Sequence, residues 1–429
     1  MKNLLLYCCL TVLCLSSIQA QKILIPMDEE QDNHLKAYGV MYAVLEKNKE
    51  AYWLLNYRGG SFAFEYTDDL KLECIRKGVS YEVNSNSKFD KTLALVNDPE
   101  VNMQAMLLEV APKIAVYTSS ASEGGKEMEP WDDAVTLALT YAEIPYDEIY
   151  DDEVLAGELS NYDWLHLHHE DFTGQFGKVY AYHGLRPWYK AHVNTLKELA
   201  AKHDFKKVSE LKLAVAKKIK NYVANGGFMF AMCSTADTYD IALAAEGLDI
   251  CDPVFDGDRA DSTAQEKLNF KNTFAFQNFE LITDPYKYEH STIDNSPYTN
   301  PPRKVKEELD YFGLFEFSAK WDPIPTMLTQ CHANTIKGFM GQTTAFRKKY
   351  IKSNVKILGE TRALGEAKYI HGTFGKGFWS FYGGHDPEDY RHYIGDLETD
   401  LHLHPNSAGY RLILNNILFP AAKRKDQAS

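Results

Sequence analysis

Buried strands alternating with amphipathic helices between residues 113 and 247 constrain the fold more than any other feature of the sequence. Short apolar runs that end in polar residues alternate there with segments whose apolar residues recur at helical spacing. The order β-α-β-α-β-α-β is typical of a parallel sheet with right-handed crossovers. The sequence therefore predicts the α/β class, with an open parallel sheet covered by helices on both faces.

Other units precede and interrupt this predicted sheet. Strands and helices alternate in a small α/β unit near the amino terminus, with one helix predicted over 68–77. A later segment is rich in Asp, Asn, Pro and Tyr and predicts local strands at 279–284 and 325–330. A hairpin turning at 374–377 follows. The predicted division is a signal peptide at 1–20, the small α/β unit at 21–110, the first part of the main domain at 111–249, an irregular insertion at 250–350, the closing part at 351–420 and a solvated tail at 421–429.

The first twenty residues have the pattern of a secretory signal peptide. Lys2 precedes an apolar run, and small residues precede Gln21. Lipoprotein processing is the alternative, because three of the seven cysteines lie in this segment. No later run reaches the ~18 apolar residues of a membrane helix. We expect a protein exported to the periplasm or beyond the cell, without a membrane span.

Charge and cysteine content exclude several classes of partner. The formal net charge is −14, and it is −15 without Lys2. An acidic chain is unsuited to nucleic acid and to anionic membranes, which leaves a small-molecule ligand or substrate as the expected partner. The four later cysteines, spread over about four hundred residues, do not form a disulfide framework.

Four polar clusters follow the predicted strands and carry the functional argument. Ligands bind beyond the carboxyl ends of strands in an open parallel sheet, so we expect these clusters to meet along one rim. They are Trp131, Asp132 and Asp133; His166, His168, His169, Glu170 and Asp171; Cys233, Ser234, Thr235 and Asp237; and His385, Asp386 and Glu388.

Cys233 is the candidate nucleophile. An apolar run ends at this cysteine and passes into a helical pattern, which predicts a strand, a sharp turn and a helix. The amino end of a helix lowers the pKa of a thiol, and N–H groups such as that of Ser234 hold a developing oxyanion. The alternative is an inert packed cysteine, since cysteine is among the most buried residue types.

His385 is the candidate general base. It ends a predicted strand, and Glu388 (or Asp386) would orient the imidazole and raise its basicity. The alternative is an ordinary turn, because Gly-Gly and Asp-Pro are also turn chemistry.

The histidine-rich run after residue 165 also suggests zinc. On a strand, His166 and His168 share one face and His169 takes the other. No HExxH helix is present, so ordinary strand residues are the alternative. The candidate zinc ligands are His166, His168, His402 and His404.

The strand at 113–118, the strand–Cys–helix unit and the late GKGFWSFYGGHDPE together resemble the class I glutamine amidotransferase-like superfamily, and its trehalose-utilisation branch in particular. The resemblance implies a flavodoxin-like sheet and a Cys-His-Glu site. The family's His-Pro-Glu appears here with one inserted residue, Asp386.

Over nearly its whole length the chain is also similar to an exported family of Bacteroidetes-type bacteria that carries the label asparagine synthetase B. The stretches WLLNYRGGSF, YDWLHLHHEDFTGQ, FAMCSTADT, GFMGQTTAF and YGGHDPEDY carry this likeness. A glycine-rich pyrophosphate loop is absent from the sequence, so the resemblance does not imply ATP-dependent synthesis.

Three functions follow from these patterns. The first is an exported hydrolase that uses Cys233, His385 and Glu388 on an amide or related small substrate. The second is a non-catalytic saccharide-binding protein that uses Trp164, Trp188 and tyrosines of the insertion. The third is a metal-dependent hydrolase at the histidines.

Overall fold

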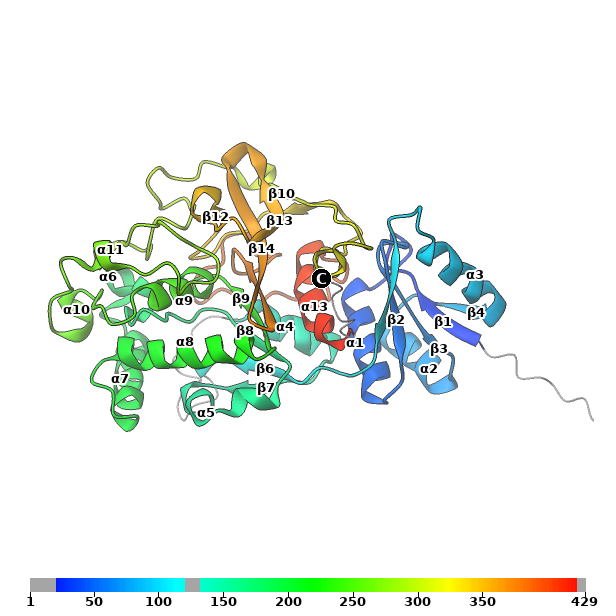
Figure 1. The fold of residues 1–429 in the computed structure, drawn as a ribbon, viewed down its shortest axis with the longest axis horizontal. Helices are drawn as coiled ribbons and strands as arrows, with labels where there is room; N and C mark the ends of the chain where they lie inside the picture. Colours follow the sequence, from blue (N-terminus) through cyan, green and yellow to red (C-terminus); the bar gives the residue numbers. More distant parts are fainter. Residues whose placement is uncertain (1–20, 120–131, 423–429) are drawn as a thin grey trace, which may run out of the picture.

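The computed structural model describes residues 21–119 and 132–422, in which the strands form two sheets (Figure 1). The predictions for residues 1–20, for Trp131 and for the tail at 423–429 lie outside the described residues. Within the described ranges, no helix has both the length and the apolar character needed to cross a membrane.

The small sheet is antiparallel and has the strand order β4-β1-β3-β2-β5. Its strands are β1 (Gln21–Ile25), β2 (Ala51–Leu55), β3 (Ser61–Glu65), β4 (Glu82–Ser85) and β5 (Gln104–Leu108), and its helices are α1 (His34–Glu46), α2 (Asp68–Lys77) and α3 (Asn86–Asn97). The predicted helix over 68–77 is confirmed. The Thr67 side chain caps its first turn, and Gly78 ends it in the left-handed region with φ 66°.

The large sheet is half parallel and half antiparallel. Neighbouring strands are parallel along β7 (Asp147–Ile149), β6 (Ile114–Tyr117), β8 (Trp164–Leu167), β9 (Phe228–Met232) and β15 (Gly377–Tyr382). They are antiparallel along β15, β14 (Glu366–Phe374), β13 (Lys356–Thr361), β10 (Tyr311–Leu314) and β11 (Thr335–Lys337), and β12 (Phe346–Arg347) pairs with β14.

The α/β class is confirmed, and the predicted parallel sheet is present from β7 to β15 as one half of a mixed sheet. Phe374 pairs with Gly377 in a tight hairpin between β14 and β15, as the sequence predicts. A hairpin reverses the chain direction, because a parallel connection needs a crossover of a dozen or more residues. The strands beyond this hairpin are also antiparallel to their neighbours.

Helices cover both faces of the parallel half. One face packs on α1, α4 (Ala134–Ala142) and α13 (Ala408–Leu418); the other packs on α5 (Asp151–Ala156), α7 (Pro187–Lys202), α8 (Val208–Ala224) and α9 (Thr235–Ala244). Trp164 and Phe230 lie in the first core, and Leu165 and Met229 lie in the second. Strands buried on both faces read as unbroken apolar runs, which explains the sequence pattern. Figure 1 shows α13 between the large sheet and the small sheet.

The segment at 250–350 is more regular than predicted. It contributes β10, β11 and β12 to the large sheet and contains the short helices α10 (Pro253–Asp256), α11 (Ala264–Lys267) and α12 (Pro323–Leu328). The predicted strand at 325–330 is wrong, because most of it lies in α12. Proline at the first helical position favours this helix start. At 279–284 only an isolated bridge forms, between Leu281 and Ser291.

Candidate functional site

Cys233 occupies the turn between β9 and α9 with a backbone φ of 51°. This left-handed conformation costs a β-carbon-bearing residue about 1–2 kcal/mol. Neighbouring backbone groups hold it there: the Cys233 N–H donates to the Gly384 carbonyl at 3.2 Å, and the Cys233 carbonyl accepts from the Ala236 N–H at 3.2 Å. The predicted sharp turn is therefore present, and its strain is of the kind that gathers at functional sites.

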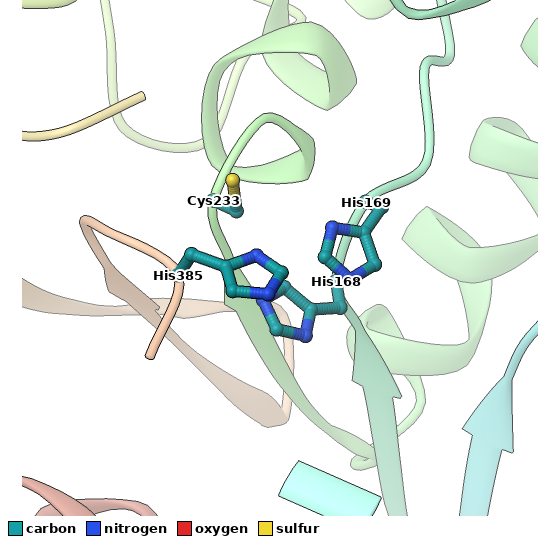
Figure 2. Close-up of side chains that lie close together, drawn as sticks. All are labelled: His168, His169, Cys233 and His385. Carbon is teal, nitrogen blue, oxygen red and sulfur yellow. The ribbon is translucent and has the colours of Figure 1, made fainter. Parts of the chain in front are cut away.

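Three strand ends bring the polar clusters to one place. In the sheet register, Leu167 of β8 lies opposite Ala231 of β9, and Tyr382 of β15 lies opposite Met232. The residues that follow these ends leave the sheet at the same edge. Figure 2 shows the result: His168, His169, Cys233 and His385 lie close together, and one donor atom from each lies within 4.8 Å of the others.

Hydrogen bonds between the loops fix this arrangement. The Thr235 N–H donates to the His168 carbonyl at 3.2 Å, and the Ser234 hydroxyl donates to the His169 carbonyl at 3.0 Å. On the other side, the His385 N–H donates to the Met340 carbonyl at 2.9 Å. The site is thus assembled from the ends of β8, β9 and β15 and from the insertion.

The imidazole rings form a stack at the rim. Ring centroids lie 3.9 Å apart for His168 and His169, 4.4 Å for His169 and His385, and 3.9 Å for His385 and His392. Burial, reinforced by neighbouring histidines, lowers the pKa of His169 and that of His385 well below the usual value. These two rings are therefore neutral near pH 7, which lets them stack without charge repulsion. The sequence argument noted His392 only as a histidine near the candidate zinc ligands His402 and His404, although it lies seven residues after His385.

Two adjacent carboxylates face the stack. Asp133 caps α4, and its oxygens lie 3.0 Å from His166 Nε2 and 3.2 Å from His168 Nδ1. Burial alone would raise the pKa of Asp133, but the two histidines hold it well below its usual range. Asp132 Oδ1 lies 3.2 Å from His392 Nε2 and 3.6 Å from His385 Nε2.

The two carboxylates predicted to orient His385 have other partners. Asp386 accepts hydrogen bonds at 2.8 Å from the Tyr410 hydroxyl and from the Glu388 N–H. Glu388 Oε2 lies 3.2 Å from His404 Nδ1. The Asp-Pro turn engages Asp386 within its own loop, and Asp132, from a different loop, is the carboxylate that the structure pairs with His385.

The environment of the Cys233 thiol reverses one prediction. Burial raises the pKa of this thiol to about 11, against the opposing effect of the backbone N–H groups of Gln342, Thr343 and Ser234. The expectation of a thiolate at a helix amino end is therefore wrong, because desolvation outweighs the N–H groups. The sulfur is a neutral thiol at pH 7, surrounded by N–H donors that the insertion helps to supply.

A cavity of about 490 Å³ opens over Cys233 and is largely apolar. Its walls include Tyr182, Trp188, Tyr288, Tyr298 and Gln342. The sequence-predicted residues that line it are His169, Glu170, Asp171, Cys233, Ser234 and His385. The tyrosines at 288 and 298 come from the insertion, so this segment forms part of the wall.

Several predicted binding residues, at the cavity or beside it, support its loops. The Thr235 hydroxyl donates to the Glu170 carbonyl at 3.0 Å. Asp237 is buried, accepts from the Thr343 hydroxyl at 2.8 Å and has its pKa raised to about 6 by burial. The Asp171 carboxylate accepts from backbone N–H groups of the loop that follows it, at Thr173, Gln175 and Gly177.

The four predicted zinc ligands do not form one group among the described residues. His166 and His168 share Asp133, whereas His402 lies 3.0 Å from Asp400 and His404 pairs with Glu388. The predicted opposition of His168 and His169 is also wrong. β8 ends at Leu167, so these two residues no longer alternate as in a strand, and their rings stack.

Trp164 cannot line a ligand site. Its ring is fully buried and stacks on His166 and Phe230 in the core. Trp188, the other tryptophan of the saccharide hypothesis, does line the cavity.

Comparisons with known proteins add little. No family model matches the chain, and no curated protein matches it. Among solved structures, it is similar to the cytoplasmic protein STM3548 of Salmonella typhimurium, with 10% identity, a TM-score of 0.33, and coverage of 71% of this chain and 97% of the other. It is also similar to the cytoplasmic protein STM1381 of Salmonella typhimurium LT2, with 13% identity, a TM-score of 0.35, and coverage of 72% and 100%. Similarity this low carries no argument about fold or function.

Proposed function

We propose that this protein is an amidotransferase-like hydrolase in which the Cys233 thiol attacks an amide or a related carbonyl. The observation that carries the proposal is the left-handed turn of Cys233 on the floor of the cavity, with imidazole nitrogens within 4.8 Å. A strained nucleophile turn between a strand and a helix exposes a side chain at the rim of an α/β sheet. The class I amidotransferase-like relationship is part of the same proposal.

His385 acts as the general base. Its lowered pKa keeps the imidazole neutral and able to accept a proton, while the raised pKa of Cys233 keeps the thiol protonated. In the proposed step the thiol proton passes to His385 as the sulfur–carbon bond forms and the carbonyl electron pair moves onto oxygen. His385 then returns the proton to the leaving amine. Water hydrolyses the resulting thioester, again with His385 as base.

Asp132 is the carboxylate that we assign to the orientation of His385. Its Oδ1 lies 3.6 Å from His385 Nε2, close enough to tighten into a hydrogen bond once the ring gains a proton. This assignment replaces Glu388, which pairs with His404.

The backbone N–H groups of Ser234, Gln342 and Thr343 supply the oxyanion donors. They already lie near the sulfur and act on its pKa. Attack of the sulfur places a negative charge on the carbonyl oxygen of the tetrahedral intermediate. This oxygen lies next to the sulfur, so the same donors stabilise it. Two of the three come from the insertion, which the sequence argument treated as a binding segment only.

The walls of the cavity favour a substrate with a ring or an apolar portion. Trp188, Tyr288 and Tyr298 offer aromatic faces, and Arg391 at the rim offers a cation. Aromatic rings of this kind pack on apolar faces, including those of sugars, which is the feature shared with the saccharide-binding alternative.

Acylation by p-nitrophenyl acetate tests the proposal without knowledge of the natural substrate. We expect a burst of one nitrophenolate per chain as one acetyl group forms on Cys233, followed by slower release as water hydrolyses the thioester; stopped-flow absorbance, intact mass and peptide mapping detect these steps. Cys233→Ala should abolish both, by a factor of about 10³ or more. Cys331→Ser, at a partly exposed cysteine outside the cavity, is the matched control and should react like the wild type.

A non-catalytic binding protein is the second candidate, and the neutral, buried thiol favours it. If Cys233→Ala acylates like the wild type, or if neither acylates, the hydrolase is excluded and the binding protein stands. Export is proposed from residues 1–20 alone, and amino-terminal sequencing of the secreted chain should then give Gln21.

A further inference from the structure

Each histidine beside Cys233 has one ring nitrogen close to an oxygen of Asp132 or Asp133, and for His169 this contact is a hydrogen bond. His168 Nδ1 lies 3.2 Å from Asp133 Oδ1, His169 Nε2 donates to the Asp132 carbonyl at 2.8 Å, and His385 Nε2 lies 3.6 Å from Asp132 Oδ1. Histidines that bind metal usually donate their other ring N–H to a carboxylate or a carbonyl in this way. The oxygens of Asp132 and Asp133 therefore lie where the outer partners of a metal site would be needed.

His168 supplies a second, independent observation. Its ring is 1% exposed, and its Nε2 has no hydrogen-bond partner among the residues that the structure describes. An unpaired buried ring nitrogen is costly unless something binds it. The His168 side chain belongs to the group of four donor residues at the rim (Figure 2).

We propose that His168, His169, Cys233 and His385 together bind one zinc ion. Three imidazole nitrogens and one sulfur suit zinc, whereas calcium and magnesium prefer oxygen ligands. Donor atoms around tetrahedral zinc lie about 3.3–3.8 Å apart, given bonds of about 2.0–2.3 Å. The four donors here lie within 4.8 Å of one another, so side-chain rotations that move each donor atom by about 1 Å complete the site.

Zinc at this site inhibits rather than catalyses. Four protein ligands close the tetrahedron, so no position is left for the water that a catalytic zinc activates. As the zinc–sulfur bond forms, the thiol proton leaves to solvent, and the sulfur is no longer free to attack a carbonyl. The inhibition rests on the proposed hydrolase, whereas the zinc site itself does not. This ligand set also differs from the four histidines that the sequence suggested.

Calorimetric titration of the metal-free full chain with zinc chloride tests the site. We expect one zinc per chain, no binding of magnesium, and loss of zinc binding in Cys233→Ser and in His168→Gln. Asp133→Asn should weaken zinc affinity about 10–100-fold, since it removes an outer partner. His402→Gln is the control, because this exposed histidine lies outside the group and should leave zinc binding unchanged. Binding that persists in both Cys233→Ser and His168→Gln overturns the proposal.

A thiol-protection experiment needs neither a variant nor a substrate. Iodoacetamide at alkaline pH should alkylate Cys233 in the metal-free wild type. One equivalent of zinc should block that alkylation, and a chelator should restore it, as read by peptide mass. Unprotected Cys233 in the presence of zinc excludes sulfur ligation. Failure of p-nitrophenyl acetate to react would exclude the hydrolase without affecting the zinc site. The two proposals can therefore be disproved separately.

Discussion

The two ends of the large sheet carry very different cavities. The cavity over the carboxyl ends of β8, β9 and β15 has a volume of about 490 Å³ and contains Cys233 and the stacked histidines. A second cavity, of about 780 Å³, lies against the amino ends of β9 and β15, beside Phe228 and Gly377. Its charged lining residues are Asp163, Lys320 and Lys376. The larger cavity is therefore lined by less reactive side chains than the smaller one.

Backbone packing explains this difference. At the amino end, the glycine turn packs so closely on its neighbours that there is no room for a side chain: a β-carbon on Gly375 would lie 2.5 Å from the Ala224 carbonyl oxygen. At the carboxyl end, each strand runs into a loop that projects polar side chains toward the other loops. Parallel strands gather these loops at one edge. Volume alone is thus a poor guide to a site in this fold.

Replacing the base at the carboxyl end should give the largest difference between the two cavities. In His385→Gln we expect acylation of Cys233 by p-nitrophenyl acetate to slow about 10²–10⁴-fold, because no base then accepts the thiol proton. Lys376→Ala, in the other cavity, should change the rate by about twofold at most. Stopped-flow release of nitrophenolate measures both, and equal rates for the two variants would remove His385 from the mechanism.

The pH dependence of alkylation sharpens the comparison. With the Cys233 pKa near 11, only a small thiolate fraction reacts at neutral pH. Iodoacetamide should modify Cys233 about 300-fold more slowly at pH 7 than a free thiol of pKa ~8.5, and the rate should rise about tenfold per pH unit toward pH 11. Quantitative peptide mass spectrometry follows the reaction. A plateau by pH 8 would mean that the thiol is activated in the resting protein.

Acid sensitivity should be a smaller effect that is specific to the carboxyl end. The folded pKa of His385 lies below the unfolded value of about 6.5, so the unfolded chain binds more protons as pH falls. This histidine should therefore lower the free energy of unfolding progressively as the pH falls below about 6.5. Urea unfolding of His385→Gln should show a correspondingly weaker pH dependence than the wild type. His402→Gln, at an exposed ring, should follow the wild type.

Much of the local structure was predictable because it depends on neighbours in sequence. The Thr67 and Gly78 signals fix α2, and the apolar run before Cys233 predicts β9 and the turn after it. The prediction at 325–330 failed because a short apolar run is compatible with a strand or a helix. The proline at the first position of α12 favours the helix. The β14–β15 hairpin was predicted, but the rest of the antiparallel half was missed because β10, from the segment predicted to be irregular, pairs with β11 and β13.

The sequence by itself determined the α/β class, the strand–Cys–helix unit and the presence of polar residues after each strand, because hydrophobic periodicity and turn chemistry are local. Only the tertiary structure decided which polar residues meet. It paired His385 with Asp132 and Glu388 with His404, and it buried Cys233 deeply enough to keep the thiol neutral. Partners and desolvation arise between segments far apart in the chain, and no local pattern encodes them.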